Sequence, residues 1–197
     1  MPEAREIPDS GETVPGRLIV LLGPSGSGKD TLISAARGEF AASPDVLFVR
    51  RMITRSADAG SEDHVSMSEA EFDAAIDEGR FALTWAANGL RYGLPRDLKA
   101  HLAAGKCAVV NGSRGAWGVI RQVFPTAVAV EIRVDPATLA RRLQARGRES
   151  ASEIEARMIR AAALTAQFDP ELVIDNSGPV ETAQAALIDY IRRSVAG

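Results

Sequence analysis

A glycine-rich segment, GPSGSGKDT from Gly23 to Thr31, has the side chains and the spacing best suited to phosphate chemistry. Gly23, Gly28 and Lys29 match the phosphate-binding loop G-x-x-x-x-G-K-[ST]. In such a loop the backbone N–H groups point at phosphate oxygens, and the lysine adds a mobile cation. We therefore expect a nucleotide site, with a purely structural glycine turn as the alternative. The predicted nucleotide-binding residues are Gly23, Pro24, Ser25, Gly26, Ser27, Gly28, Lys29, Asp30 and Thr31.

One position of this segment departs from the motif. Asp30 stands where a serine or threonine normally follows the lysine and binds magnesium. Thr31 is not a substitute, because one step along a helix turns the side chain by about 100°. We expect Asp30 itself to bind Mg²⁺, directly or through water, since this ion prefers oxygen ligands. The alternative is a solvated aspartate that stabilises the first helical turn.

The elements that must position this segment can be predicted from short apolar runs that alternate with helical patterns. The predicted buried strands are RLIVLLG, DVLFVR, CAVVNG, AVAVEIRV and ELVIDN. Helices are predicted after Ser68, from Pro95 to His101, after Asp135-Pro136 and after Ser150. This alternation indicates an α/β fold with a mostly parallel sheet covered on both faces. Ligands bind at the carboxyl ends of such strands, and the glycine-rich segment follows the first one.

The composition limits the classes of function. The chain has 197 residues, of which 46% are hydrophobic, and this suits one globular domain. Its 23 basic and 26 acidic residues give a net charge of −3, without the basic excess of a general nucleic-acid binder. No run reaches the roughly 18 apolar residues of a membrane span, so we expect no membrane partner. We expect residues 1–16 to form a flexible tail and residues 17–197 a single domain.

Cys107 is the single cysteine of the chain, and it lies in the apolar run KCAVVN. A single cysteine excludes an intramolecular disulfide, and no metal-ligand spacing surrounds it. We therefore expect a buried structural thiol rather than a nucleophile, in a protein of the reducing cytoplasm.

Beyond the glycine-rich segment, the order of the motifs resembles the guanylate kinase family from about Arg17 to the last helix. ITR at residues 53–55 resembles the family's TTR, which implies that Arg55 grips the acceptor phosphate. WAANGLRYG at residues 85–93 resembles WA..GN.YG and places Tyr92 on a tyrosine that binds the same phosphate. The resemblance implies a P-loop kinase fold in which helices flank the parallel sheet and a small region binds the acceptor.

The segment RRLQARGRES, followed by Arg157, resembles the family's lid segment RL..RG.E…R. The resemblance implies a helical lid that bears Arg142, Arg146 and Arg157, with Arg142 at the ATP and the other two catalytic. A solvated helix face is the alternative for each arginine. Lid closure would exclude water, and Gly147 would be either a hinge or a helix end.

Four positions depart from the guanylate kinase pattern. Asp58 stands where that family has a second arginine, and Thr84 where a glutamate precedes the tryptophan. Val110 and Gly112 stand where acidic residues hold the guanine. A site without these acids offers no acceptors to the N–H groups of guanine and should lose its selectivity for that base. We therefore expect a phosphorylated substrate without a base.

The segments GPSGSGKD, ITR, GLRYG and VVNGSR more closely resemble the ribose 1,5-bisphosphate phosphokinases of phosphonate metabolism. This resemblance implies ATP- and Mg²⁺-dependent phosphorylation of ribose 1,5-bisphosphate to 5-phosphoribosyl 1-diphosphate. It also implies that Asp30 is a feature of the subfamily rather than an anomaly.

Two arginines, Arg91 and Arg114, occupy the region from which the guanine contacts have gone, and one of them is expected to meet the 5-phosphate. His64 falls near another phosphate-binding tyrosine of guanylate kinases, although the expectation for it is a surface histidine. The implied substrate-binding residues are Arg55, Tyr92, Arg91, Arg114 and Thr84. The implied catalytic residues are Lys29, Arg146 and Arg157.

Three other functions remain open at this stage. A nucleoside monophosphate kinase would use the same chemistry with a different acceptor. A guanylate-kinase-like module can bind proteins without catalysis, although such modules have usually lost the loop lysine that Lys29 provides here. A general ATPase would leave Arg55 and Tyr92 without a purpose. The oligomeric state is left open.

Overall fold

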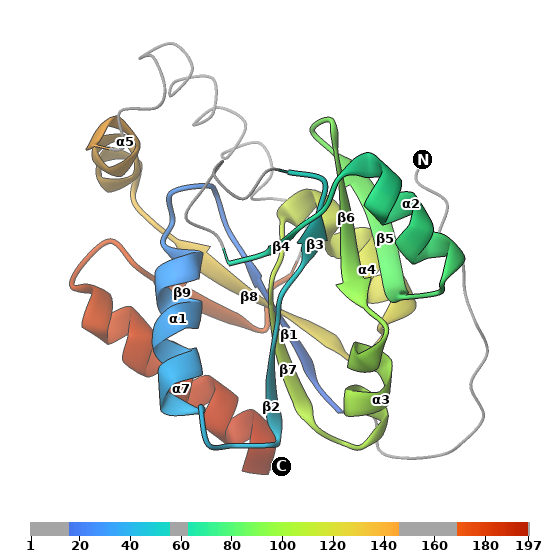
Figure 1. The fold of residues 1–197 in the computed structure, drawn as a ribbon. Helices are drawn as coiled ribbons and strands as arrows, with labels where there is room; N and C mark the ends of the chain where they lie inside the picture. Colours follow the sequence, from blue (N-terminus) through green and yellow to red (C-terminus); the bar gives the residue numbers. More distant parts are fainter. Residues whose placement is uncertain (1–15, 56–62, 146–168, 197) are drawn as a thin grey trace.

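The computed structural model describes residues 16–55, 63–145 and 169–196 (Figure 1). Several of the expectations above lie outside the described residues. They concern residues 1–15 of the tail, Asp58, the helix after Ser150, and the lid residues Arg146, Gly147 and Arg157.

The central sheet consists of five parallel strands in the order β2-β7-β1-β8-β9. All five predicted strands are confirmed, as β1 (Leu18–Leu22), β2 (Val46–Val49), β7 (Cys107–Asn111), β8 (Ala127–Arg133) and β9 (Leu172–Asp175). β1 lies in the middle of the sheet, and every residue in it is buried because both faces are covered. The glycine-rich loop therefore leaves the sheet at its centre.

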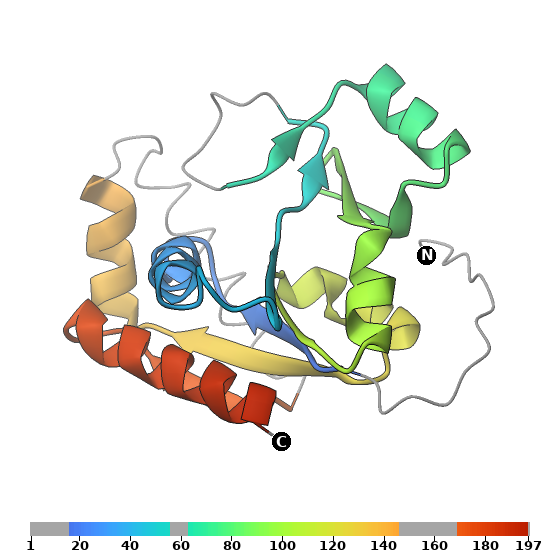
Figure 2. The same ribbon diagram turned by 60° about the horizontal axis from the view of Figure 1, so that its bottom comes forward.

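Helices cover both faces of this sheet, in two groups (Figure 2). The helices in the described residues are α1 (Lys29–Glu39), α2 (Glu69–Asp77), α3 (Asp97–Ala103), the short 3-10 helix η2 (Arg114–Ala116), α4 (Trp117–Val123), α5 (Pro136–Ala145) and α7 (Val180–Ala196). α1 and α7 share a core cluster with Ile19 and Leu21 of β1. α3, η2 and α4 share the other large cluster with Leu18, Val20 and Leu22. α2 and α5 belong to neither group. No helix in the described ranges is long and apolar enough to cross a membrane.

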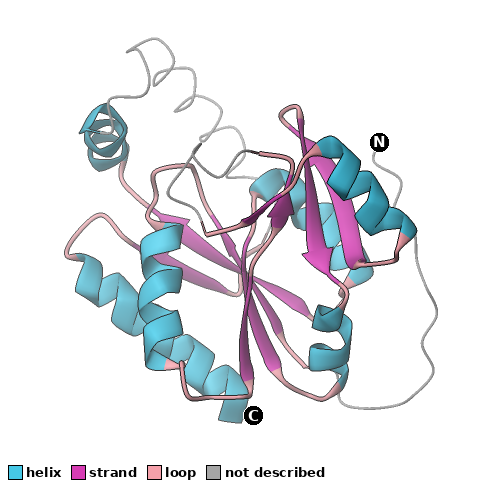
Figure 3. Cartoon of the chain, viewed as in Figure 1, coloured by secondary structure: helices cyan, strands magenta, loops and turns pink. Residues whose placement is uncertain are grey.

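A smaller sheet with the strand order β4-β3-β6-β5 follows the carboxyl end of β2 (Figure 3). Its strands are β3 (Met52–Ile53), β4 (Val65–Ser66), β5 (Phe81–Ala87) and β6 (Leu90–Pro95). β5 and β6 form a hairpin around Asn88 and Gly89, whose φ angles are 52° and 72°. Positive φ at both central residues is what a two-residue hairpin turn requires, and Asn-Gly provides it. This sheet contains the LRYG residues and Ile53 of ITR, and Thr54 and Arg55 follow directly after β3.

Two of the predicted helix starts are confirmed in atomic detail. Ser68 Oγ accepts a hydrogen bond from the backbone N–H of Glu71 at 3.2 Å, and the Glu71 carboxylate accepts one from the backbone N–H of Ser68 at 2.7 Å. This reciprocal capping box begins α2. Asp135 begins α5 by accepting from the backbone N–H of Thr138 at 2.8 Å, and this hydrogen bond lowers the pKa of the Asp135 carboxyl.

The helix predicted to open at Pro95 is wrong at its start. Pro95 is the last residue of β6, where it pairs with Phe81 of β5, and α3 begins at Asp97. Because Pro95 closes the strand, its missing N–H removes no hydrogen bond from the interior of the sheet. The strand pairing has thus overridden a local helix-start signal.

The prediction of a buried, structural Cys107 is confirmed. The residue is 2% exposed, and burial raises the pKa of its thiol to about 11. Since only the thiolate reacts, we expect about one thiol in 10³ to be ionised at pH 8, and that fraction lies inside the core. Iodoacetamide should therefore leave the folded protein unlabelled for hours at pH 8 and label it fully in guanidinium chloride, as intact-mass spectrometry would record. Rapid labelling of the folded chain would contradict this account.

Candidate functional site

The glycine-rich loop connects the end of β1 to the start of α1 at the centre of the sheet. Gly28 is the residue before α1 and has a φ of 93°, a conformation that L side chains rarely adopt. A Cβ at this position would also lie 2.5 Å from Nδ2 of Asn176. Both constraints restrict position 28 to glycine. The N-terminus of α1 is therefore open to a phosphate.

Asn176 holds the loop from the neighbouring strand end. It follows β9, is 1% exposed, and donates from Nδ2 to the carbonyl of Ser27 at 2.7 Å. Its own backbone N–H donates to the carbonyl of Arg133 at the end of β8, which fixes its position. In the sequence, the only signal for Asn176 is a polar side chain after a buried strand, and no role was predicted for it.

Lys29 extends back across the loop. Its Nζ donates to the carbonyls of Gly23 and Pro24 at 2.9 Å and 3.0 Å, and lies 3.5 Å from Oγ of Ser27. The ammonium group is therefore held at the loop itself by neutral oxygens. A phosphate oxygen is a stronger partner for a cation than a carbonyl is, so a bound polyphosphate would compete for this group.

Asp30 has a partner that the sequence analysis did not identify. Asn111, the last residue of β7, donates from Nδ2 to Oδ1 of Asp30 at 2.7 Å. The two residues come together because β7 lies beside β1, with Asn111 opposite Leu21. Thr31, the next residue of α1, is exposed. The carboxylate is thus oriented at the loop rather than left to solvent.

The acceptor motif ITR begins on the last residue of β3, LRYG lies on the neighbouring strand β6, and hydrogen bonds join the two motifs. The backbone N–H of Thr54 donates to the carbonyl of Arg91 at 3.0 Å, and Thr54 Oγ1 accepts from the backbone N–H of Arg91 at 2.9 Å. The backbone N–H of Arg55 donates to the carbonyl of Ile53 at 2.8 Å, in a tight turn that ends β3. Tyr92 lies opposite Ile53 on β6. The structure therefore brings together the two segments assigned to the acceptor phosphate.

Arg91 itself is bound to α2. Its Nη1 lies 2.6 Å from Asp73 Oδ1 and 3.2 Å from Glu69 Oε2, and its guanidinium carbon lies 4.4 Å from the centre of the Phe72 ring. The hydrogen bond to Asp73 raises the pKa of Arg91. The contacts with α2 give Arg91 a role in holding this helix to the hairpin. Thr84, another implied substrate-binding residue, lies on β5 opposite Gly93 of β6.

Arg114 belongs to a buried charged cluster at the end of β8. Its Nη2 lies 2.9 Å from Oε1 of Glu131, and the two side chains are 7% and 1% exposed. Arg133 Nε approaches the other oxygen of Glu131 at 2.7 Å. Glu131 lies opposite Leu22, directly before the loop. The sequence analysis missed Glu131, because a lone acid in an apolar run gives no sign of its partners.

The expectation of a surface position for His64 is wrong. His64 is only 8% exposed, and its Nε2 lies 3.2 Å from Oγ of Ser66. The chain is fixed here because the preceding residue, Asp63, forms ion pairs with Arg37 of α1 and Arg50. These ion pairs hold the segment that leads into β4 beside α1 and the end of β2.

α5 places Arg142 near the loop. A Cβ on Gly26 would lie 3.0 Å from Leu143 and 3.1 Å from Leu139, so this helix packs directly on the glycine-rich segment. Nη1 of Arg142 is buried and makes no hydrogen bond within the described ranges. The position agrees with the expected ATP contact, which stays a prediction. No group of three His, Cys, Asp or Glu side chains suited to a metal occurs in residues 16–55, 63–145 and 169–196.

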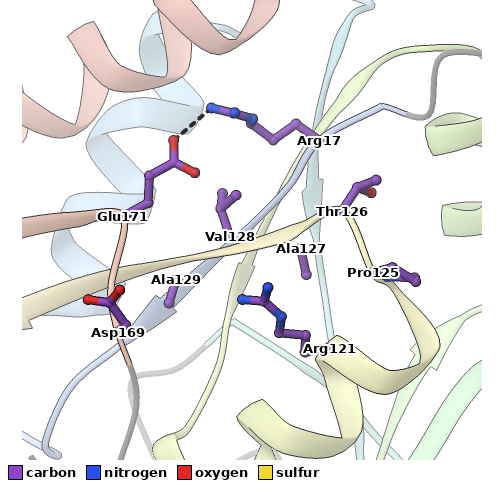
Figure 4. A pocket seen from close by; sticks show the side chains of 9 residues that line it. All are labelled: Arg17, Arg121, Pro125, Thr126, Ala127, Val128, Ala129, Asp169 and Glu171. Carbon is purple, nitrogen blue, oxygen red and sulfur yellow. Dashed lines mark hydrogen bonds and ion pairs between the residues drawn. The ribbon is translucent and has the colours of Figure 1, made fainter.

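A pocket lies at the opposite end of the sheet from the loop (Figure 4). Arg17 precedes β1 and forms an ion pair with Glu171 there, while Arg121 and Asp169 approach from other segments. The first residues of β8, Ala127 to Ala129, line its wall. Because parallel α/β folds bind ligands at the carboxyl ends of their strands, this pocket is not the phosphate site.

The comparisons with known proteins agree with this geometry. A sequence model described as "Guanylate kinase" matches residues 15–194. Ribose 1,5-bisphosphate phosphokinase PhnN of Desulfomicrobium baculatum is 47% identical over 176 residues, which cover 89% of this chain and 94% of the relative. The protein of the same name from Pseudomonas paraeruginosa is 46% identical over 177 residues, covering 89% and 95%. That from Agrobacterium fabrum is 43% identical over 178 residues, covering 90% and 97%.

Solved structures share the fold. A crystal structure of guanylate kinase from Anaplasma phagocytophilum matches with a TM-score of 0.65 at 17% identity, covering 93% of this chain and 88% of that one. A sugar kinase from Janibacter sp. HTCC2649 matches with a TM-score of 0.51 at 17% identity, covering 90% and 95%. At these identities the likeness concerns the fold, and it confirms the predicted α/β kinase architecture.

Proposed function

The chain belongs to the guanylate kinase family, and we infer that it transfers a phosphoryl group from ATP to ribose 1,5-bisphosphate, giving 5-phosphoribosyl 1-diphosphate and ADP. Its curated relatives carry the name ribose 1,5-bisphosphate phosphokinase. The protein is therefore an enzyme that takes a phosphorylated sugar and ATP as small-molecule substrates.

This assignment rests on Gly112 and Val110, which stand where guanylate kinases have the acidic residues that bind guanine. The surroundings of Gly112 leave no room for an acidic side chain. A Cβ on Gly112 would lie 2.4 Å from Cγ1 of Val20, and the backbone N–H of Gly112 donates to the carbonyl of Leu21 at 2.9 Å. Val110 is 1% exposed in the core. A guanine would find no carboxylate from either position, and an unpaired buried N–H strongly disfavours such a ligand.

The phosphoryl transfer requires that the acceptor oxygen be aligned with the γ-phosphorus, and it does not require a general base. An oxygen of the 1-phosphate is already anionic, so it forms a bond to the γ-phosphorus while the bond to the β,γ-bridging oxygen breaks and ADP leaves with that electron pair. Lys29 stabilises the charge on the outer phosphates, and Arg55 with Tyr92 orients the acceptor. We also propose Arg142, Arg146 and Arg157 as cations that close over the transferring group; the last two lie outside the described residues.

We propose Asp30 as the residue that holds Mg²⁺. The fit rests on the chemistry and the orientation of this residue, since a carboxylate suits this hard cation and the hydrogen bond from Asn111 orients the Asp30 side chain at the loop. When bound, the ion would reduce the negative charge of the polyphosphate. We expect the enzyme in the cytoplasm, where a buried thiol such as Cys107 stays reduced.

Replacement of Asn111 by leucine should weaken the response to Mg²⁺ through Asp30. Loss of a partner that orients a metal ligand typically costs about 10- to 100-fold in metal affinity. We therefore expect the half-saturating Mg²⁺ concentration to rise about tenfold, with the KM for ribose 1,5-bisphosphate unchanged. Steady-state rates across a magnesium titration measure this. An unchanged Mg²⁺ requirement would show that the hydrogen bond has no part in metal binding.

The activity is tested by phosphorus NMR of the purified protein with ATP, Mg²⁺ and ribose 1,5-bisphosphate, beside a parallel sample with guanosine monophosphate. A new diphosphate signal in the sugar sample alone supports the assignment. Turnover of the nucleotide alone would mean that Val110 and Gly112 had been misinterpreted. If neither acceptor turns over but the protein still binds ATP, the acceptor has been wrongly assigned.

A further inference from the structure

The strand register assigns the side chains of the smaller sheet to two faces. Tyr92 of β6 lies opposite Ile53 of β3 and opposite Trp85 of β5. Residues directly opposite each other share a face, and these three side chains belong to the core cluster that includes α3 and α4. We call this the inner face. Arg91 is adjacent to Tyr92 in the chain and therefore projects from the outer face, where it contacts α2.

The ring of Tyr92 is held by its neighbours, whereas its hydroxyl is not. The residue is only 7% exposed, and its ring stacks on that of Trp85 with ring centres 5.3 Å apart and an interplanar angle of 8°. The guanidinium carbon of Arg51 lies 5.4 Å from the centre of the same ring. Within residues 16–55, 63–145 and 169–196, no group hydrogen-bonds to the Tyr92 hydroxyl. A buried tyrosine hydroxyl usually has a partner, so a ligand is the expected partner here.

The position of a tyrosine hydroxyl depends on how the ring is held. The oxygen lies on the axis about which the ring turns, so rotation about the Cα–Cβ bond is what displaces it. A change of about 30° in that torsion moves the oxygen by roughly 2 to 3 Å, which is enough to break a hydrogen bond. A flat aromatic neighbour blocks this movement. Trp85 is 6% exposed in the core cluster, so its own ring is fixed as well.

We propose that Trp85 is a positioning residue for the acceptor: by stacking on Tyr92, it fixes the tyrosine hydroxyl where that group donates to the 1-phosphate. The proposal rests on the proposed function, in which Tyr92 and Arg55 orient the acceptor. The contact with substrate belongs to Tyr92, and Trp85 acts only through that residue. An aliphatic side chain at position 85 would still fill the core but would leave the Tyr92 ring free to tilt.

A double-mutant cycle tests this coupling. The KM for ribose 1,5-bisphosphate would be measured for the wild type, Trp85→Leu, Tyr92→Phe and the variant with both changes. A hydrogen bond to a charged group contributes about 10- to 100-fold in affinity, so Tyr92→Phe should raise the KM about tenfold or more. We expect about tenfold for Trp85→Leu. The double variant should lie within about threefold of Tyr92→Phe, because a ring without a hydroxyl leaves nothing to position.

A merely structural role for Trp85 predicts a different result. The two effects would then multiply, to about 100-fold or more in the double variant, or Trp85→Leu would leave the KM unchanged. Either outcome would overturn the proposal. The KM does not depend on how much of the enzyme is folded, so partial unfolding does not mimic the expected coupling.

Phe81→Leu is the matched control, because Phe81 is another stacked aromatic residue of β5. Its ring stacks on Phe72 of α2 with ring centres 4.6 Å apart. A Cβ on Gly93, the neighbour of Tyr92, would lie 2.2 Å from the Phe81 ring, which places this ring on the outer face. Both Phe81→Leu and Trp85→Leu should lower the Tm by about 2–8 °C through lost packing. Phe81→Leu should nevertheless keep the KM within about threefold of wild type.

Trp85→Phe is the conservative variant. It keeps a flat aromatic face against Tyr92 and should hold the KM within about threefold of wild type. A rise in KM as large as that of Trp85→Leu would show that stacking is not what matters and would refute the proposal. If Trp85→Leu does not fold, as judged by thermal unfolding, Trp85→Met takes its place in the cycle with the same expected result.

Turnover of ribose 1,5-bisphosphate by the wild type separates this proposal from the function on which it rests. If the wild type converts the bisphosphate and the cycle shows no coupling, only the role of Trp85 is wrong. If the wild type does not convert the bisphosphate, the function itself is wrong and the proposal is overturned with it.

Discussion

Lys29→Met should lower kcat by about 10³-fold, which corresponds to about 4 kcal/mol of transition-state stabilisation. The substitution keeps the length of the side chain and removes the charge that is held at the loop by the carbonyls of Gly23 and Pro24. Gly23, Pro24 and Lys29 are each partly exposed, so the free energy of unfolding should change by less than about 1 kcal/mol. Coupled-enzyme rates and chemical denaturation measure the two quantities.

Lys106→Met provides the control for this substitution. Lys106 forms an ion pair with Asp45 at 3.2 Å and donates to the carbonyl of Pro44 at 3.1 Å, far from the loop in the fold. Exposed pairs of this kind contribute little, and we expect wild-type rates. Residual activity of Lys29→Met within about tenfold of wild type would contradict the catalytic assignment of Lys29.

Asp30→Ala should lower kcat/KM by about 10²-fold or more and raise the Mg²⁺ requirement of ATP binding, because it removes the proposed metal ligand. Asp30→Ser, which restores the usual residue of the motif, should recover part of the loss. Calorimetry of ATP with and without Mg²⁺, beside steady-state kinetics, separates metal binding from turnover.

Asp97 offers a matched control for the alternative role of Asp30. It also lies in the first turn of a helix, α3, where a carboxylate favours the positive end of the helix. Asp97→Ala should cost about 0.5 kcal/mol of unfolding free energy and leave the rate unchanged. If Asp30→Ala behaves in the same way, Asp30 only stabilises its helix and the metal assignment is wrong.

The sequence predicted the features that depend on local patterns. The five central strands follow from short apolar runs, and Ser68 and Asp135 give clear helix starts. The β5-β6 hairpin also has a local signal, because Asn88-Gly89 lies between two strands and favours a two-residue turn. The helix start predicted at Pro95 is wrong because Pro95 pairs with Phe81 of β5, and this pairing depends on residues that are distant in the sequence.

The partners of the site residues could not be predicted in the same way. Asn111 and Asp30 are 81 positions apart, and their contact exists because β7 and β1 are neighbours in the sheet. Glu131 meets Arg114 across the ends of β7 and β8. The sequence shows which residues are able to form such pairs. It does not show the order of the strands in the sheet, and this order decides which residues meet.

The hydrogen bond from Asn176 to Ser27 determines when the glycine-rich loop can take its final shape during synthesis. The motif from Gly23 to Thr31 leaves the ribosome early, but the side chain that holds Ser27 comes 149 residues later, at Asn176. A nascent chain that has not reached Asn176 therefore contains the whole motif without the contact that holds its shape. Nucleotide becomes a folding ligand only for a polypeptide that extends past Asn176, so products that terminate before this residue gain little protection from cellular ATP against proteolysis.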